Sequence, residues 1–131
     1  MKKKILIVAS NYYEGITKTL INGSLNTLKF NKKDIKIIKV PGTFEIPVII
    51  SKNLARFDGF IALGCVIKGE TPHFEFICHS TFDALQSLSI KSKKPIGNGI
   101  ITVLNMSQAK KRSLLKGQEA AKAMLEVIMN G

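Results

Sequence analysis

The order of apolar segments along the chain constrains its fold more than any other feature of the sequence. Short apolar runs alternate four times with longer segments whose apolar side chains recur at helical spacing, a pattern typical of strand-helix units around a parallel sheet. The predicted strands cover residues 5–9, 35–40, 60–67 and 96–103. The third run is nearly all apolar, which favours a central strand covered on both faces.

Helical spacing predicts one helix after each strand, in residues 15–29, in residues 45–54, from Pro72 to the break at 91–95, and from Ser107 towards Met129. Thr71 is expected to cap the third helix and Ser107 the fourth, while Gly117 is expected to interrupt the fourth. No linker or repeat divides the chain, so we expect residues 1–131 to form a single domain. The predicted fold is α/β: a three-layer α/β/α sandwich with a mainly parallel four-stranded sheet, flavodoxin-like.

Composition argues against several other classes of protein. No apolar run approaches the roughly 18 residues of a membrane span, so no membrane partner is expected. The apolar run at 5–9 is shorter than a signal-peptide core, and the two cysteines, Cys65 and Cys78, form no CxxC pair. We therefore expect a cytoplasmic protein without a disulfide framework or a metal site.

The net charge of +11 raises the question of a nucleic-acid partner. The lysines lie in small scattered groups, with no helix-turn-helix, zinc-finger or aromatic RNA-binding pattern beside them. A solvated, lysine-rich surface is therefore the preferred interpretation, and no nucleic acid is expected to bind.

Residues suited to a polar ligand follow three of the four predicted strands. They lie in residues 11–14, 41–45 and 68–73. Because the carboxyl ends of parallel strands meet at one edge of a sheet, where α/β proteins bind ligands, we expect these segments to form one site.

The third of these segments has the features of an anion site. Gly69 precedes the expected helix start, which would leave backbone N–H groups directed outwards at the positive end of the helix dipole. His73 is expected in the first helical turn, where the dipole disfavours the imidazolium form and leaves a ring able to accept a proton. A surface or capping histidine without a ligand is the alternative.

Five other side chains are candidates for contact with a ligand. A ring of Tyr12 or Tyr13 either stacks on a flat heterocycle or packs partly into the core. Glu45 either accepts hydrogen bonds from ligand hydroxyls or is a helix-start acid without a ligand. Arg112, one of only two arginines, either grips a phosphate with its guanidinium fork or belongs to a solvated basic run. Cys65 lacks an evident base partner and is interpreted as a small apolar residue.

These residues occur in a combination that resembles the lumazine synthases over nearly the whole chain. Supporting matches lie in residues 5–17, 95–102, 108–112 and 116–121. The two strongest matches are Val40-Pro41-Gly42-Thr43-Phe44-Glu45-Ile46-Pro47 and Leu63-Gly64-Cys65-Val66-Ile67-Lys68-Gly69-Glu70-Thr71-Pro72-His73-Phe74-Glu75. Either is fairly specific for the family, and both in this order are highly so.

The resemblance implies an enzyme of riboflavin biosynthesis. Such an enzyme condenses 5-amino-6-(D-ribitylamino)uracil with 3,4-dihydroxy-2-butanone 4-phosphate to give 6,7-dimethyl-8-ribityllumazine, phosphate and water, and needs no metal or organic cofactor. The resemblance also implies a homo-oligomer with active sites at subunit interfaces. A pentamer is the expected unit, and the sequence leaves open whether pentamers assemble further into a 60-subunit shell.

The resemblance assigns roles to individual residues. His73 would transfer protons and Tyr12 would stack on the pyrimidine. The ribityl chain would contact Thr43, Phe44 and Glu45. Backbone groups of three residues would read the pyrimidine edge: Cys65, Val66 and Ile67. The phosphate would bind Glu70 and Thr71 through main-chain donors, together with Arg112, while Asn98 would line the pocket from a neighbouring subunit.

Some positions depart from the family pattern. Many members have Arg-Phe-Asn where this chain has Asn11-Tyr12-Tyr13, and Asn98 and Lys68 replace a phenylalanine and an arginine of relatives. Two alternative functions are an archaeal-type riboflavin synthase, which uses the lumazine as its substrate, and a non-catalytic flavin-binding shell protein.

Overall fold

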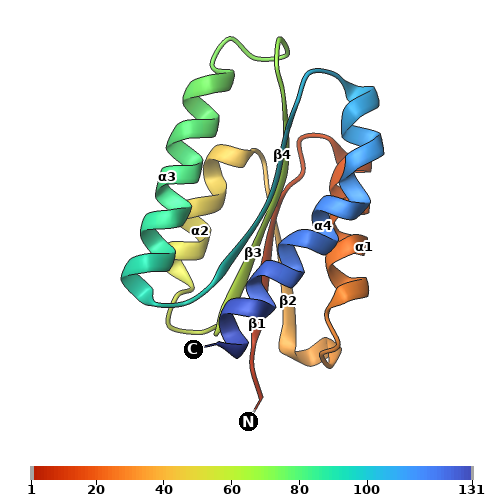
Figure 1. Cartoon of the computed structure of the whole chain (residues 1–131). Coiled ribbons are helices and arrows are strands. Elements are labelled where there is room, and N and C mark those ends of the chain that lie inside the picture. The colour runs from red at the N-terminus through yellow and green to blue at the C-terminus, as the bar shows by residue number, and fades with distance from the viewer. Residues whose placement is uncertain (1, 131) are drawn as a thin grey trace.

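The computed structural model describes residues 2–130, so both ends of the predicted 1–131 domain lie outside the described residues. One parallel sheet has the strand order β2-β1-β3-β4. The strands are β1 (Ile5–Ser10), β2 (Ile35–Val40), β3 (Gly59–Ile67) and β4 (Ile96–Val103). Helices α2 and α3 cover one face of the sheet and α1 and α4 the other (Figure 1). The predicted three-layer α/β/α fold is confirmed.

The two inner strands of the sheet are its most apolar segments. Every residue of β1 and β3 is buried, because helices cover both faces of these strands. Side chains of β1 alternate between the two helical layers: Ile5 and Ile7 pack in the cluster that includes residues of α1 and α4, and Leu6 and Val8 in the cluster with α2 and α3.

The helix boundaries correct several predictions. The helices are α1 (Glu14–Thr27), α2 (Ile46–Lys52), α3 (Phe74–Ser92) and α4 (Met106–Met129), with short 3-10 helices η1 (Lys32–Asp34) and η2 (Thr43–Glu45). The expected helix at 45–54 is shorter at both ends, because Glu45 belongs to η2 and Asn53 is the C-cap of α2. Within residues 2–130, no helix has both the length and the apolar character that crossing a membrane requires.

The predicted caps of α3 and α4 were wrong. His73 occupies the N-cap position of α3, and the Thr71 hydroxyl accepts a hydrogen bond from the backbone N of His73 at 3.2 Å, which closes a turn before the helix. At α4 the cap is Asn105, whose Oδ1 accepts from the backbone N of Gln108 at 2.9 Å. Oε1 of Gln108 accepts a hydrogen bond from the backbone N of Leu104 at 2.8 Å. The side chains of Asn105 and Gln108 therefore cap this helix end together.

Gly117 does not interrupt α4, contrary to the prediction. It lies where α4 crosses α1, and a Cβ on Gly117 would stand 2.2 Å from the carbonyl oxygen of Leu20. The matching position on α1 is Gly23, where a Cβ would stand 2.4 Å from the carbonyl oxygen of Leu114. The Ser24 hydroxyl donates to the carbonyl of Gly117 at 2.9 Å. The two glycines therefore let the helix backbones approach closely.

Candidate active site

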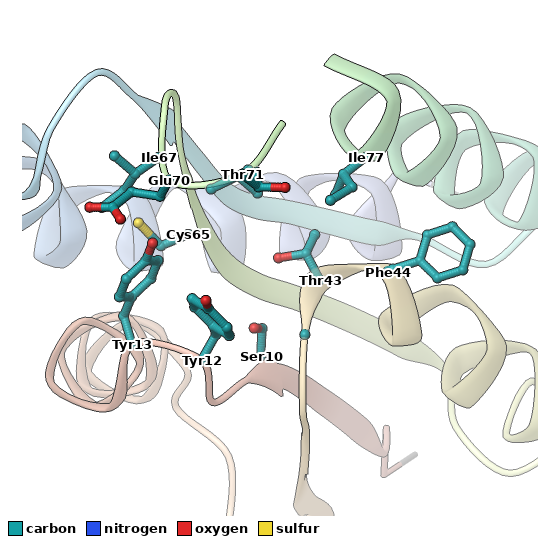
Figure 2. A pocket seen from close by; sticks show the side chains of 12 residues that line it. Ser10, Tyr12, Tyr13, Thr43, Phe44, Cys65, Ile67, Glu70, Thr71 and Ile77 are labelled. Carbon is teal, nitrogen blue, oxygen red and sulfur yellow. The ribbon is translucent and has the colours of Figure 1, made fainter. Parts of the chain in front are cut away.

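The three polar segments meet in one cleft at the carboxyl edge of the sheet (Figure 2). The cleft has a volume of about 210 Å³ and is bounded by the ends of β1 and β3, by η2, by the loop after β3 and by the start of α3. Its lining residues are Ser10, Tyr12, Tyr13, Gly42, Thr43, Phe44, Cys65, Val66, Ile67, Glu70, Thr71 and Ile77. Eight of the twelve predicted site residues are among them: Tyr12, Thr43, Phe44, Cys65, Val66, Ile67, Glu70 and Thr71.

Successive residues of η2 lie at different depths in the cleft. Thr43 is only 6% exposed, whereas Phe44 is 64% exposed and extends towards solvent. Thr43 lies close to the neighbouring strand because Gly64 has no side chain: a Cβ there would be 2.9 Å from the Thr43 Oγ1. Glu45 is half-buried beside Gly42, 3.1 Å from where a Cβ of that glycine would stand, and is not among the lining residues.

The end of β3 contributes backbone and a buried thiol. Residues Cys65, Val66 and Ile67 are buried and line the cleft. Burial raises the pKa of the Cys65 thiol to about 11, so the thiol is neutral at physiological pH. A neutral, buried thiol agrees with the interpretation of Cys65 as a small apolar residue.

The loop after β3 is a tight turn. Gly69 has a φ of 91°, in the left-handed region that favours glycine, and the backbone N of Lys68 donates to Val103 at 2.9 Å. The backbone N of Glu70 donates to the carbonyl of Ile67 at 3.2 Å. An anion that took its hydrogen bond from Glu70 would have to displace this internal bond, whereas the sequence suggested an outward-facing donor.

Four predicted site residues lie outside the cleft: Glu45, His73, Asn98 and Arg112. His73 is exposed, two residues after Thr71. Arg112 is exposed on α4 and lines a different hollow, between α4 and β4, together with Thr102. Asn98 is exposed on the edge strand β4, and its Oδ1 accepts a hydrogen bond from the backbone N of Ile100 at 3.0 Å.

Sequence reasoning assigned no site role to Ser10 or Ile77. Ser10 is the last residue of β1, and a polar residue that ends an otherwise apolar strand is the signal that could have identified it. Ile77 is on α3, where it is half-buried and faces the cleft (Figure 2). Helical spacing places a residue on an inner face without distinguishing core from cleft.

The lining suits a flat, polar molecule. Aromatic rings from Tyr12 and Tyr13, backbone groups at the end of β3 and the hydroxyl of Thr43 surround the space, and Glu70 supplies a carboxylate at one end (Figure 2). Among residues 2–130, no three His, Cys, Asp or Glu side chains come together as metal ligands would. Fold and cleft together define an α/β protein with a small-molecule site at the carboxyl edge of a parallel sheet.

Within this class the chain belongs to the 6,7-dimethyl-8-ribityllumazine synthase family, whose model matches residues 2–130. A protein of that name from Bartonella tribocorum is 41% identical, with 98% of this chain and 91% of the relative covered. Relatives with the same name from Buchnera aphidicola and Limosilactobacillus reuteri are 42% and 39% identical, over 97% and 95% of this chain and 86% and 87% of theirs. The resemblance inferred from the two motifs is confirmed, and the comparisons do not favour the alternative functions.

Proposed function

We propose that this chain condenses 5-amino-6-(D-ribitylamino)uracil with 3,4-dihydroxy-2-butanone 4-phosphate to give 6,7-dimethyl-8-ribityllumazine, phosphate and water. Membership of the family over residues 2–130 carries this proposal. The position of the cleft supports it, because six of the residues that the family pattern assigns to the pyrimidine and the ribityl chain come from three separate segments and line the cleft together.

The pyrimidine binds between the Tyr12 ring and the end of β3. Tyr12 is 69% exposed beside the cleft, which leaves one ring face free for stacking. Backbone groups of residues 65–67 read the edge of the heterocycle. Thr43 and Phe44 hold the ribityl chain, and the family pattern adds Glu45, which lies beside Gly42.

His73 moves protons during imine formation and phosphate elimination. Its exposed position next to Thr71 lets the imidazole reach a substrate held in the cleft. The sugar phosphate binds at Thr71 and at the Glu70 backbone N, where it displaces the hydrogen bond to Ile67, with Arg112 as the guanidinium partner. The cleft itself contributes mainly proximity, because it holds two substrates in a fixed geometry.

The complete site includes a second copy of the chain. The family pattern assigns Asn98 and Arg112 to the cleft of a neighbour, and the position of both residues on β4 and α4, outside the cleft of their own chain, supports this assignment. Such a head-to-tail contact closes into a ring, here a pentamer, with a 60-subunit shell as the larger assembly. The protein acts in the cytoplasm as a single domain, residues 1–131, with small-molecule substrates, no cofactor and no nucleic-acid partner.

The optical absorbance of the lumazine tests this function. Both substrates with the protein should give the lumazine spectrum at a rate well above that of the two substrates alone. The lumazine incubated alone with the protein tests the riboflavin synthase alternative, since riboflavin would then form. Binding of riboflavin without any acceleration of lumazine formation would contradict the proposal and favour a non-catalytic flavin-binding protein.

A further inference from the structure

Tyr12 and Tyr13 form an aromatic pair at one end of the cleft. Their ring centroids are 4.8 Å apart and their planes meet at 86°, an edge-to-face arrangement (Figure 2). Both residues line the cleft, yet Tyr12 is 69% exposed while Tyr13 is half-buried. The pair therefore joins an exposed ring to an anchored one.

Tyr13 is anchored through both its backbone and its ring. Its carbonyl accepts hydrogen bonds from the backbone N and the Oγ1 of Thr17, at 2.9 and 3.0 Å. Its ring packs against the apolar cluster between the sheet and helices α1 and α4, beside which Met106 also packs. The hydroxyl is directed towards Cys65 and Glu70 (Figure 2). Burial raises the pKa of Tyr13 and the Glu70 carboxylate adds to the increase, so the ring is neutral at physiological pH.

Tyr13 also separates the cleft from a second hollow. That hollow has a volume of about 510 Å³, and residues of α1 and α4 line it, among them Thr19, Lys110 and Ser113. Tyr13 lines both spaces. Without its ring, Tyr12 would lose its edge-to-face partner and gain room to turn away from the cleft.

We propose that Tyr13 is a positioning residue, whose ring fixes the orientation of Tyr12 so that the Tyr12 face is ready to stack on the pyrimidine. This inference rests on the proposed function. A largely exposed tyrosine exchanges between rotamers, and a ring that is ordered before binding avoids part of the entropy loss on binding. Tyr13 acts here through Tyr12, and its own hydroxyl is not required.

A spectroscopic test of this orientation needs no substrate. The chain has two tyrosines and no tryptophan, so Tyr13→Phe leaves Tyr12 as the only tyrosine fluorophore. We expect time-resolved anisotropy of Tyr12 to show little fast motion in Tyr13→Phe, and an added nanosecond component in Tyr13→Ala. The same anisotropy decay in both variants would overturn the proposal. If Tyr13→Ala does not fold, Tyr13→Leu replaces it, because leucine retains apolar bulk but has no ring edge.

A kinetic test uses a double-mutant cycle. We expect Tyr13→Ala to raise KM for the pyrimidine about 3- to 10-fold, in keeping with one aromatic pair, while kcat changes less than about 2-fold. Tyr13→Phe should restore KM to near the wild-type value. In a Tyr12→Ala background, Tyr13→Ala should have little further effect, because the residue it positions is already absent.

The outcomes separate this proposal from the proposed function. A wild-type protein that forms no lumazine contradicts the function, and the anisotropy comparison then decides alone whether Tyr13 orients Tyr12. With an active wild type, an equal rise in KM with and without Tyr12 would show that Tyr13 does not act through it. Equal damage by Tyr13→Phe and Tyr13→Ala would assign the effect to the hydroxyl and also overturn the proposal.

Discussion

Individual residues of the site differ in how directly the structure supports their roles. His73 is the N-cap residue of α3, and its side chain is exposed and makes no capping hydrogen bond, so we expect its removal to leave the fold intact. We expect His73→Ala to slow turnover about 10- to 10⁴-fold, since general acid/base groups contribute on this scale and the uncatalysed condensation can mask part of the loss.

The steady-state rate, the thermal unfolding temperature and the assembly size of His73→Ala should all be measured. The last two show whether the variant is correctly folded. Both properties should match the wild type, because the imidazole is exposed. A correctly folded variant with the wild-type rate would exclude His73 from proton transfer.

Cys65 gives a prediction about pH and stability. Its folded pKa is about 11, against an ordinary value of 9.0, so the unfolded chain releases this proton first as the pH rises. The stabilisation from the neutral, buried thiol is fully present below pH 9 and is lost as the pH rises through about 11. We expect this group to lower the free energy of unfolding by on the order of 2 kcal/mol across that window.

Urea unfolding at several pH values, in wild type and Cys65→Ala, measures the contribution of this thiol. The alanine variant should lose less stability than wild type between pH 9 and pH 11, since only the thiol titration is removed. Parallel pH profiles for the two proteins would mean that the thiol is not shielded from water.

The role of Asn98 could not be predicted from strand order within one chain. The family pattern assigns it to a neighbouring subunit's pocket, whereas within its own chain its Oδ1 already accepts a hydrogen bond from Ile100. The residues of the cleft were predictable because they directly follow strands that must end at one edge. The positions of Asn98 and Arg112 relative to a neighbour's cleft depend on the contact between chains, which strand order alone does not define.

At the scale of elements, the crossing of α1 and α4 gives the sharpest prediction. We expect Gly117→Ala to destabilise the protein by about 1–3 kcal/mol, because the new methyl group would meet the backbone of Leu20. Gly15→Ala is the matched control, because it is also in a helix and has no heavy atom within 4 Å of a Cβ. Alanine there should leave stability unchanged or raise it by up to about 1 kcal/mol.

The denaturation midpoints of Gly117→Ala and Gly15→Ala, measured at equal protein concentration, compare the effects of the two substitutions on stability. Equal shifts of the midpoint in Gly117→Ala and Gly15→Ala would contradict the claim that Gly117 is needed for the close approach of α1 and α4.

Strands were predicted from the sequence more accurately than helix ends. The boundaries of β2 and β4 agree with the prediction, and those of β1 and β3 differ by one residue, because breakers bound each apolar run. The residue at which a helix starts depends on which nearby polar side chain accepts a hydrogen bond from a backbone N–H of the first helical turn. Ser107 and Asn105 are both capable caps, and the interaction of Asn105 with Gln108 decides between them. Gly117 was misjudged because propensity takes no account of a neighbouring helix.

At the scale of the whole molecule, the shared active site is testable by mixing chains. His73→Ala and Arg112→Ala are each expected to be slower than the wild type by about 10-fold or more when assembled alone. Refolded together at equal amounts, about a quarter of the interfaces should combine an intact His73 with an intact Arg112, because a head-to-tail ring draws the two residues from different chains.

Mixed rings should therefore regain activity well above the average of the two parents. Mass spectrometry of intact assemblies can verify that the chains have mixed. Activity equal to the parental average in mixed rings would place both residues in the same chain's site and reject the shared arrangement.

The strand order also has a consequence for the sequence of events during synthesis. β1 is made first but lies inside the sheet, where Ile5 pairs with Ile35 on one side and with Gly59 on the other. The chain must therefore be synthesised as far as Leu63, nearly half of its 131 residues, before this strand, apolar except for Ser10, is paired on both edges. Long-range parallel pairing of this kind slows folding and leaves a hydrophobic segment open to aggregation. The time between synthesis of β1 and synthesis of β3 is thus the period in which this segment is most exposed to contacts with other chains.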